Sequence, residues 1–456
     1  MSDWSSISFD HLKSLYFLGI GGIGMSALAR YFQQRGISIY GYDRTETALT
    51  KKLVAEGMQI HYTPDPESIP TDIDLIVYTP AVPASNTEWE ALRASGKPIL
   101  KRAEVLGLIS RNSRTIAVAG THGKTSTSTM LTHLLRSTGI DCTAFLGGIA
   151  LNFQSNYIEG KSDWVVVEAD EYDRSFLHLR PELAAIMSTD PDHLDIYGDH
   201  GKMLEGGFGA FAQLVEKGLF LEQSALPEFS GKVKVFRFGL EKGDYRATNI
   251  RVEEGAFVFD FEFPEGVLKE LRTTMPGRHN IENATAAIAL ALNAGADPDL
   301  IRNGLLEFRG IKRRFERIFE GKRIVYIDDY AHHPTELKAA IRAAKELFPN
   351  RKITGIFQPH LFSRTRDFSN GFAEALDELD EAVVLDIYPA REEAIPGVDS
   401  EMILRQMKLD KKEIQTKASL IDALKQKQID VLLTLGAGDI DTLVEPISQY
   451  LREQER

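Results

Sequence analysis

The residues best suited to chemistry lie in the stretch AGTHGKTST at 119–127. An apolar run at 115–118 precedes it and predicts a short buried strand, and a helical pattern follows. Backbone N–H groups at such a helix start face an anion, a lysine adds a point charge, and a threonine hydroxyl can bind Mg²⁺. The usual glycine five residues before Gly123 is replaced by Val118, and Gly120 stands nearby instead. The pattern predicts a shortened phosphate loop, with an ordinary glycine-rich turn as the alternative.

A second glycine-rich loop, GIGGIG at 19–24, follows a strand predicted over 15–18 and opens a helix predicted over 25–35. The next strand ends on Asp43. This GxGxxG arrangement predicts a Rossmann-type unit that holds a diphosphate, with the acid within reach of a ribose hydroxyl. NAD and a UDP-linked sugar both present a diphosphate, so the motif leaves the nucleotide open. Tight helix–strand packing without a ligand is the third interpretation.

Two further turns in the first third follow predicted strands. YTPAVP at 78–83 follows the strand at 75–78, and KRAE at 101–104 follows the strand at 98–100. Ligands of parallel sheets collect beyond the carboxyl ends of the strands. These turns are therefore candidate substrate loops or plain connections, and a domain boundary is expected near 106–113.

Acidic clusters end two predicted strands in the middle of the chain. The strand at 164–167 runs into EADE, and the strand at 183–187 runs into STDPDH. Oxygen ligands suit Mg²⁺, which usually takes only one or two protein carboxylates. Glu168 is the favoured ligand, and the other acids after it are expected to cap a helix or face solvent. His193 is either a ligand or a structural histidine.

The region from 205 to 275 predicts a helix followed by an antiparallel excursion. GRHNIEN at 277–283 then opens an alanine-rich helix that reaches residue 292. Asn280 and Asn283 stand at its expected start. Asparagine there could cap the helix or form hydrogen bonds with the edge of an adenine ring, and both interpretations stay open.

The last third begins with a basic linker, GIKRRF at 310–315. It is either a solvated turn or a device that carries an arginine back to a phosphate. Four predicted strands, over 323–327, 353–357, 382–388 and 430–435, end on polar clusters with helices between them. This alternation predicts another doubly wound unit with one functional edge.

Bulk composition narrows the class of protein. A length of 456 residues suggests about three domains. The formal charge of −13 argues against binding to nucleic acid or to an anionic membrane, which both require a basic face. The single cysteine, Cys142, excludes an internal disulfide, and the start MSDW has no basic or long apolar region. A cytoplasmic protein is therefore expected.

Taken together, these motifs resemble the Mur ligase family over nearly the whole chain. The matching stretches, in order, are GIGGIGMSALA (19–29), AGTHGKTST (119–127), EADEYDRSF (168–176), DHLDIY (192–197), GRHNIENATAA (277–287), DDYAHHPTE (328–336), FQPHLFSRTRDF (357–368) and TLGAGDI (434–440). The resemblance implies an α/β fold of three domains. These are a Rossmann-like N-terminal domain for a UDP-sugar (1–107), a central P-loop ATPase-type α/β domain (108–309) and a C-terminal Rossmann-like domain (310–456). The last domain would bind the amino acid and close the ATP site.

The resemblance also implies roles for individual residues. Those at ATP would be Gly120, Thr121, His122, Gly123, Lys124, Thr125, Ser126, His279, Asn280, Asn283, Arg314 and Asp329, with Lys124, His193, Arg314 and Asp329 catalytic. Those at two Mg²⁺ ions, for which Mn²⁺ could substitute, would be Thr125, Glu168 and His193. Those at the UDP-sugar would be Gly19, Gly21, Gly22, Ile23, Gly24, Asp43, Thr79, Ala81, Val82, Arg102 and Glu104. His333, His360 and Arg364 would face the incoming amino acid.

The implied reaction is ADP-forming ligation of L-alanine to the lactyl carboxylate of UDP-N-acetylmuramate through an acyl phosphate, in peptidoglycan precursor synthesis. The partners would be these small molecules, and the protein would be a monomer or a weak homodimer. A ligase that adds a whole tripeptide, a nicotinamide-dependent oxidoreductase and a non-catalytic nucleotide-binding regulator remain alternatives. PHLFSRTRDF and LDIYPAREEAIPG favour the single amino acid.

Two positions depart from the pattern of the family. Related ligases carry a carbamylated lysine 14–15 residues after the DH histidine, where this chain has Gly207 and Phe208. No carbamate is therefore expected. An arginine often follows the PH pair, where this chain has Leu361. Arg364 would then make the carboxylate contact alone, or another group would compensate.

Overall fold

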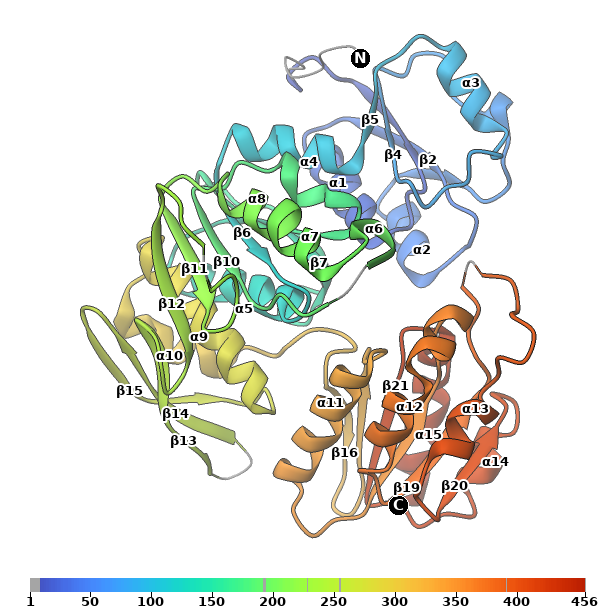
Figure 1. The fold of residues 1–456 in the computed structure, drawn as a ribbon. Helices are drawn as coiled ribbons and strands as arrows, with labels where there is room; N and C mark the ends of the chain where they lie inside the picture. Colours follow the sequence, from blue (N-terminus) through green and yellow to red (C-terminus); the bar gives the residue numbers. More distant parts are fainter. Residues whose placement is uncertain (1–8, 192–193, 228, 254–255, 391, 456) are drawn as a thin grey trace. The chain divides into compact units, whose positions relative to one another are not determined.

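The computed structural model describes residues 9–191, 194–227, 229–253, 256–390 and 392–455. By internal contacts the chain, as far as it is described, divides into two units. The first comprises Met1–Thr248, Asp260–Leu271 and Glu282–Phe308, and the second comprises Asn249–Phe259, Arg272–Ile281 and Arg309–Arg456. Three sheets, which we call A, B and C in chain order, organise the described residues (Figure 1). No helix in the described ranges has the length and apolar character needed to span a membrane.

Sheet A is a parallel five-stranded sheet of order β3-β2-β1-β4-β5, the strand order of the Rossmann fold. Its two faces are covered because odd and even positions of β1 enter different apolar clusters: Leu15 and Phe17 face α1 and α4, and Tyr16 and Leu18 face α3. The elements are β1 (Ser14–Leu18), α1 (Ile23–Gln33), β2 (Ser38–Tyr42), α2 (Ala48–Ala55), β3 (Gln59–His61), η2 (Pro66–Ser68), β4 (Leu75–Tyr78), α3 (Glu88–Ala94), β5 (Ile99–Lys101) and α4 (Arg102–Arg111).

Sheet B has ten strands in the order β15-β14-β13-β12-β11-β10-β6-β9-β7-β8. Its strands are β6 (Arg114–Ala119), β7 (Thr143–Ala150), β8 (Ser155–Ile158), β9 (Trp164–Glu168), β10 (Leu183–Ile186), β11 (Gly218–Glu222), β12 (Lys234–Leu240), β13 (Tyr245–Glu253), β14 (Ala256–Phe263) and β15 (Gly266–Thr273). Its helices are α5 (Lys124–Ser137), η3 (Tyr172–His178), α6 (Leu194–Tyr197), α7 (His200–Met203), η4 (Leu204–Gly209), α8 (Ala210–Ala212), α9 (Arg278–Asn293) and α10 (Pro298–Glu307).

The antiparallel excursion predicted over 205–275 is partly wrong. β10, β11, β12 and β13 pair in parallel, one with the next. The apolar run of β11 is buried and extends the sheet, so its composition gives no indication of strand direction. Further along the chain β13, β14 and β15 are successive neighbours in the sheet, and β14 and β15 are joined by two residues, as in a hairpin. Residues 257–261 of β14 are all buried, so this strand is covered on both faces.

Sheet C is six-stranded, in the order β16-β17-β21-β18-β19-β20, with every pair parallel except β16 against β17. All residues of β18, β19 and β21 are buried, as expected for strands covered on both faces. The elements are β16 (Glu316–Glu320), β17 (Val325–Asp329), α11 (Pro334–Leu347), β18 (Ile353–Phe357), α12 (Phe362–Leu376), β19 (Glu381–Leu385), α13 (Glu401–Gln406), β20 (Lys412–Gln415), α14 (Leu420–Leu424), β21 (Val431–Leu435), η5 (Asp439–Leu443) and α15 (Val444–Gln454). The fold is therefore α/β with mainly parallel sheets, as predicted.

Candidate active site

The phosphate loop joins β6 to α5, and two of its glycines are required by geometry. Gly120 and Gly123 have φ angles of +134° and +81°, a region that favours glycine. A Cβ atom would lie 2.8 Å from the backbone nitrogen of Ser188 at the first position and 2.6 Å from Asn283 Oδ1 at the second. α5 begins at Lys124 with no side-chain cap and no acid in its first turn. Its first N–H groups are therefore suited to a phosphate.

Ser188, directly after β10, holds this loop in place. Its hydroxyl lies 2.8 Å from Thr121 Oγ1 and accepts a hydrogen bond from His122 N at 2.9 Å. Thr121 N donates to the carbonyl oxygen of Ser188 at 3.1 Å. Ser188 was not predicted, because only the acids and the histidine of STDPDH were taken as functional residues. The feature of the sequence that indicates its role is a hydroxyl placed directly after a strand that neighbours β6.

Lys124 is paired with a carboxylate that the sequence analysis also missed. Its Nζ lies 2.5 Å from Gly120 O and 2.8 Å from Glu171 Oε2, and these two side chains are only 14% and 1% exposed. Burial lowers the pKa of the ammonium, but the carboxylates of Glu171, Asp170 and Glu168 raise it above its usual range overall. Lys124 therefore carries a fixed positive charge at the loop.

The candidate metal ligands provide oxygen atoms. Glu168 ends β9, and its Oε2 accepts a hydrogen bond from Gly147 N at 3.0 Å. Thr125 is buried in the first turn of α5. These donors fit Mg²⁺, which keeps several water ligands. The third predicted ligand, His193, lies outside the described residues, and the described residues contain no group of three or more His, Cys, Asp or Glu side chains that could hold a metal.

Asn280 and Asn283 do not cap the helix, so the capping interpretation is wrong. α9 begins at Arg278, and both residues lie inside it, buried. Asn280 Nδ2 donates to Pro276 O at 2.7 Å. Asn283 Oδ1 lies 3.3 Å from Thr127 Oγ1, directly against the phosphate loop. Their roles at the nucleotide stay predictions.

Close backbone approaches bring the predicted UDP-sugar residues together. Gly19 has a φ angle of +90°, and a Cβ there would lie 2.6 Å from Thr79 Cγ2 and 2.9 Å from Val82 Cγ2. A Cβ at Gly24 would lie 3.0 Å from the side chain of Arg102. The glycine loop therefore meets the turns after β4 and β5, the arrangement expected at the carboxyl edge of sheet A.

Two of the predicted UDP-sugar carboxylates bind the protein backbone. Asp43 accepts hydrogen bonds from Gly21 N at 2.7 Å and from Thr45 N at 3.2 Å. Glu104 accepts one from Lys101 N at 2.6 Å and caps α4. Both carboxylates therefore shape the loops, and their contacts with a ligand remain predictions.

An unpredicted buried network fixes the start of α1. Asn156 on β8 donates to Ile23 O at 2.6 Å and to Ser26 Oγ at 3.0 Å, and it accepts a hydrogen bond from Arg30. Arg30 also forms two hydrogen bonds, of 2.7 and 3.0 Å, with Glu56. Asn156 is fully buried and Arg30 is 4% exposed. The helix that follows the first glycine loop is therefore tied to sheet B.

In the second unit, Asp329 organises the basic linker. Its carboxylate accepts hydrogen bonds from Phe315 N and Ala331 N, both at 2.7 Å. Burial raises the pKa of this carboxyl to about 6. Arg314 directly precedes Phe315, and its guanidinium lies 4.0 Å from Glu336 Oε1. Asp329 thus fixes the segment from which Arg314 extends.

The predicted amino-acid residues cluster at the starts of α11 and α12. His333 is the N-cap of α11, and Arg364 lies in the first turn of α12. The ring of His360 lies 6.0 Å from the ring of His332, which the sequence analysis did not select. Burial lowers the pKa of His332, and the charge of Arg364 acts in the same direction, although Glu336 opposes it. The cluster therefore combines a neutral imidazole with a permanent cation.

Leu361, where the family pattern often has arginine, adopts a rare backbone conformation. Its φ angle is +70°, its side chain is buried, and its N–H donates to Tyr388 O at 2.9 Å. Such strain in a residue other than glycine is found mainly at functional sites. The side chain packs inside the protein and so cannot replace the arginine as a carboxylate ligand.

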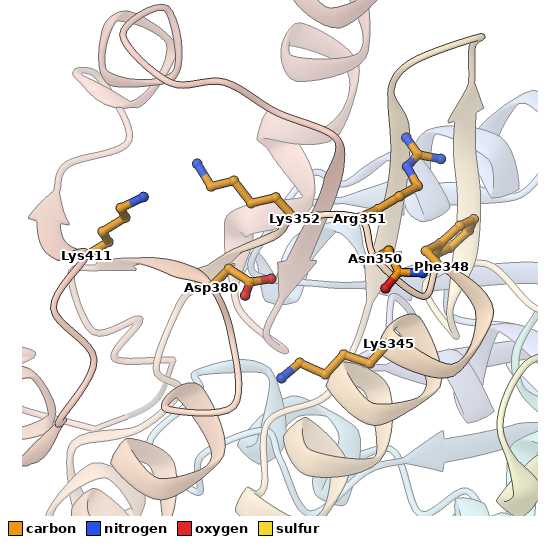
Figure 2. A pocket seen from close by; sticks show the side chains of 7 residues that line it. All are labelled: Lys345, Phe348, Asn350, Arg351, Lys352, Asp380 and Lys411. Carbon is orange, nitrogen blue, oxygen red and sulfur yellow. The ribbon is translucent and has the colours of Figure 1, made fainter.

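A hollow of about 620 Å³ lies at the opposite edge of sheet C, before β18, β19 and β20 begin (Figure 2). Its cations are largely engaged: Lys352 pairs with Glu381, and Arg351 donates to the carbonyl oxygen of Asp430 at 2.6 Å. Because the active edge of a parallel sheet is the carboxyl edge, this hollow is not part of the candidate site. It is lined by Lys345, Phe348, Asn350, Arg351, Lys352, Asp380 and Lys411.

The described chain carries a phosphate loop on one α/β sheet, with a Rossmann-like parallel sheet earlier in the sequence and a mainly parallel one later. This combination is typical of an ATP-dependent ligase of several domains. Models of three domains match in order: the Mur ligase family catalytic domain over 14–114, the Mur ligase middle domain over 118–291 and the Mur ligase glutamate ligase domain over 313–438. The chain belongs to the Mur ligase family.

Particular relatives match over the full length. The chain is 48% identical to a UDP-N-acetylmuramate–L-alanine ligase of Porphyromonas gingivalis, over 97% of this chain and 99% of the relative. It is 44% identical to the ligase of the same name from Flavobacterium johnsoniae, over 98% and 100%. A solved structure of a UDP-N-acetylmuramate-alanine ligase MurC from Thermotoga maritima superposes with a TM-score of 0.84 at 31% identity, over 97% of this chain and 100% of that one.

Proposed function

We propose that this protein ligates L-alanine to the lactyl carboxylate of UDP-N-acetylmuramate in peptidoglycan synthesis, with conversion of ATP to ADP and phosphate. The observation that carries the proposal is the phosphate loop with its charged Lys124, in a chain similar over its full length to ligases of that name. Other phosphate-loop proteins share the first feature only.

The chemistry proceeds in two balanced steps. A carboxylate oxygen of the sugar attacks the γ-phosphorus of ATP, ADP leaves, and an acyl phosphate forms. The neutral amine of L-alanine then attacks the acyl carbon, phosphate leaves from the tetrahedral intermediate, and the proton that the amine nitrogen loses ends on the released phosphate. Lys124 and Arg314 neutralise the developing phosphate charge, and Asp329 positions the linker of Arg314. Exclusion of water protects the acyl phosphate from hydrolysis.

Mg²⁺ belongs to this proposal through Thr125 and Glu168, with His193 at a second ion and Mn²⁺ as a substitute. When bound, the metal screens the phosphate charge. The hydrogen bond from Gly147 N to Glu168 and the negative surroundings that raise the pKa of Lys124 support a cation here. We also propose the domain limits 1–107, 108–309 and 310–456, which limited proteolysis would test, and a monomer or weak homodimer, which sedimentation would test.

The decisive experiment is a coupled assay of phosphate release. Release should require ATP, UDP-N-acetylmuramate and L-alanine together, and mass spectrometry should find the product of condensation. Phosphate release without the amino acid would contradict the proposal. Replacing L-alanine by the tripeptide tests the recycling ligase, and a fluorescence titration with NADH tests the oxidoreductase.

A further inference from the structure

Phe368 is an exposed aromatic residue next to the predicted amino-acid site. Its side chain is 39% exposed, and no other large apolar side chain in the described part of 309–456 is as exposed. Exposed single apolar residues are common and need no explanation by themselves. The exposure of Phe368, however, has an explanation in the residues around it.

Phe368 lies four residues after Arg364 on α12, so both side chains emerge from the same face of the helix. Its ring meets the ring of His333 edge-on, with 4.9 Å between the centroids and 70° between the planes. α11 and α12 pack closely there, because a Cβ at Gly371 would lie 2.9 Å from Pro334 Cγ. Phe368 therefore belongs to the same cluster as two of the three predicted amino-acid residues.

Arg364 indicates that this face of α12 binds the carboxylate end of the amino acid. It is half-buried, and no carboxylate or hydrogen-bond acceptor engages it within the described chain. A guanidinium in that state is suited to bind the α-carboxylate of the incoming amino acid, by two parallel hydrogen bonds. The side chain of an amino acid anchored in this way lies within a few ångströms of its carboxylate, and an apolar group one helical turn from the anchor can meet it.

We propose that Phe368 is a specificity-determining residue whose ring limits the side chain of the amino acid to about the size of a methyl group. The inference rests on the proposed function and names the part of the site that distinguishes L-alanine from larger amino acids. A wall of this kind acts by steric exclusion, and one methylene in such a pocket changes selectivity by roughly 10- to 200-fold.

The test compares kcat/KM for L-alanine and L-valine. Phe368→Ala should lower the preference for L-alanine by at least about tenfold, mainly through faster reaction of L-valine. Phe368→Trp should act in the opposite direction, lowering the rate with L-alanine relative to that with glycine. Phe368→Leu, which keeps apolar contact with α11, should give an intermediate preference.

Asp367→Asn is the matched control, because Asp367 is the preceding residue on the same helix, is exposed and, among the described residues, pairs with exposed Arg366 alone. Its selectivity should equal that of the wild type. An unchanged alanine-to-valine ratio in folded Phe368→Ala would overturn the inference, as would an equal loss with both amino acids. A wild-type protein that does not use L-alanine would contradict the proposed function itself, so the two failures are distinct.

Discussion

Lys124 carries the positive charge that we propose for the γ-phosphate, and its removal has a clear expected outcome. Lys124→Ala should lower kcat by at least about 100- to 1000-fold, the effect of losing one electrostatic contact to a transition state. UDP-N-acetylmuramate should still bind, as calorimetry would measure. Lys425→Ala is the control, since that lysine is exposed and its ion pair in the described structure is a local one with Asp422. Ligation by the Lys124 variant near the wild-type rate would refute the assigned role.

Asp329 gives a pH dependence. Its pKa of about 6 lies above the ordinary value of 3.8, so folding favours its protonated form. Its contribution to stability is therefore present below pH 4 and is lost as the pH rises through 6. Activity runs the other way: below pH 6 the protonated carboxyl accepts less well from Phe315 N, and kcat/KM should fall. Rate profiles should show this acid limb in the wild type and lack it in Asp329→Asn.

At the scale of elements, the strand β7 approaches Glu168 so closely that a glycine is required. A Cβ at Gly147 would lie 2.3 Å from Glu168 Oε2. Gly147→Ala should displace this carboxylate and raise the Mg²⁺ concentration needed for half-maximal activity by about tenfold, as for other disturbed ligand shells. Gly206→Ala, where a Cβ meets nothing within 4 Å, should leave the requirement unchanged. An equal Mg²⁺ requirement in both variants would contradict the proposed ligand role of Glu168.

Elements were predictable wherever the pattern was local. The runs before each glycine loop became β1 and β6, and the run at 75–78 became β4 without a change of bounds. α5 begins earlier than its apolar residues indicate, because the loop itself turns into helix at Lys124. Ser188 and Glu171 escaped prediction since their importance comes from partners on other elements. Whether β11 and β12 run parallel or antiparallel to the sheet likewise depends on the strands beside them, and their own residues do not indicate it.

At the scale of the whole molecule, the buried network around Asn156 is one of the contacts that link sheets A and B. Asn156→Ala leaves Arg30 short of an acceptor in a buried setting, which should cost about 1–3 kcal/mol of unfolding free energy. Urea denaturation would measure this loss, and the KM for UDP-N-acetylmuramate should rise because the start of α1 is released. Asn370→Ala, which removes only an exposed contact with Glu374, should change neither. Equal stability of the two variants would show that the network is dispensable.

The closed pair of Lys124 and Glu171 has a consequence for inhibitor chemistry. A neutral compound that fills only the adenine region would leave this pair intact and gain nothing from the lysine. An anionic compound would have to separate the two charges and leave a buried glutamate without its cation, which is costly in a low-dielectric setting. The strongest competitors of ATP should therefore carry a metal ion or a hydrogen-bond donor that satisfies Glu171, together with the anion that takes its place.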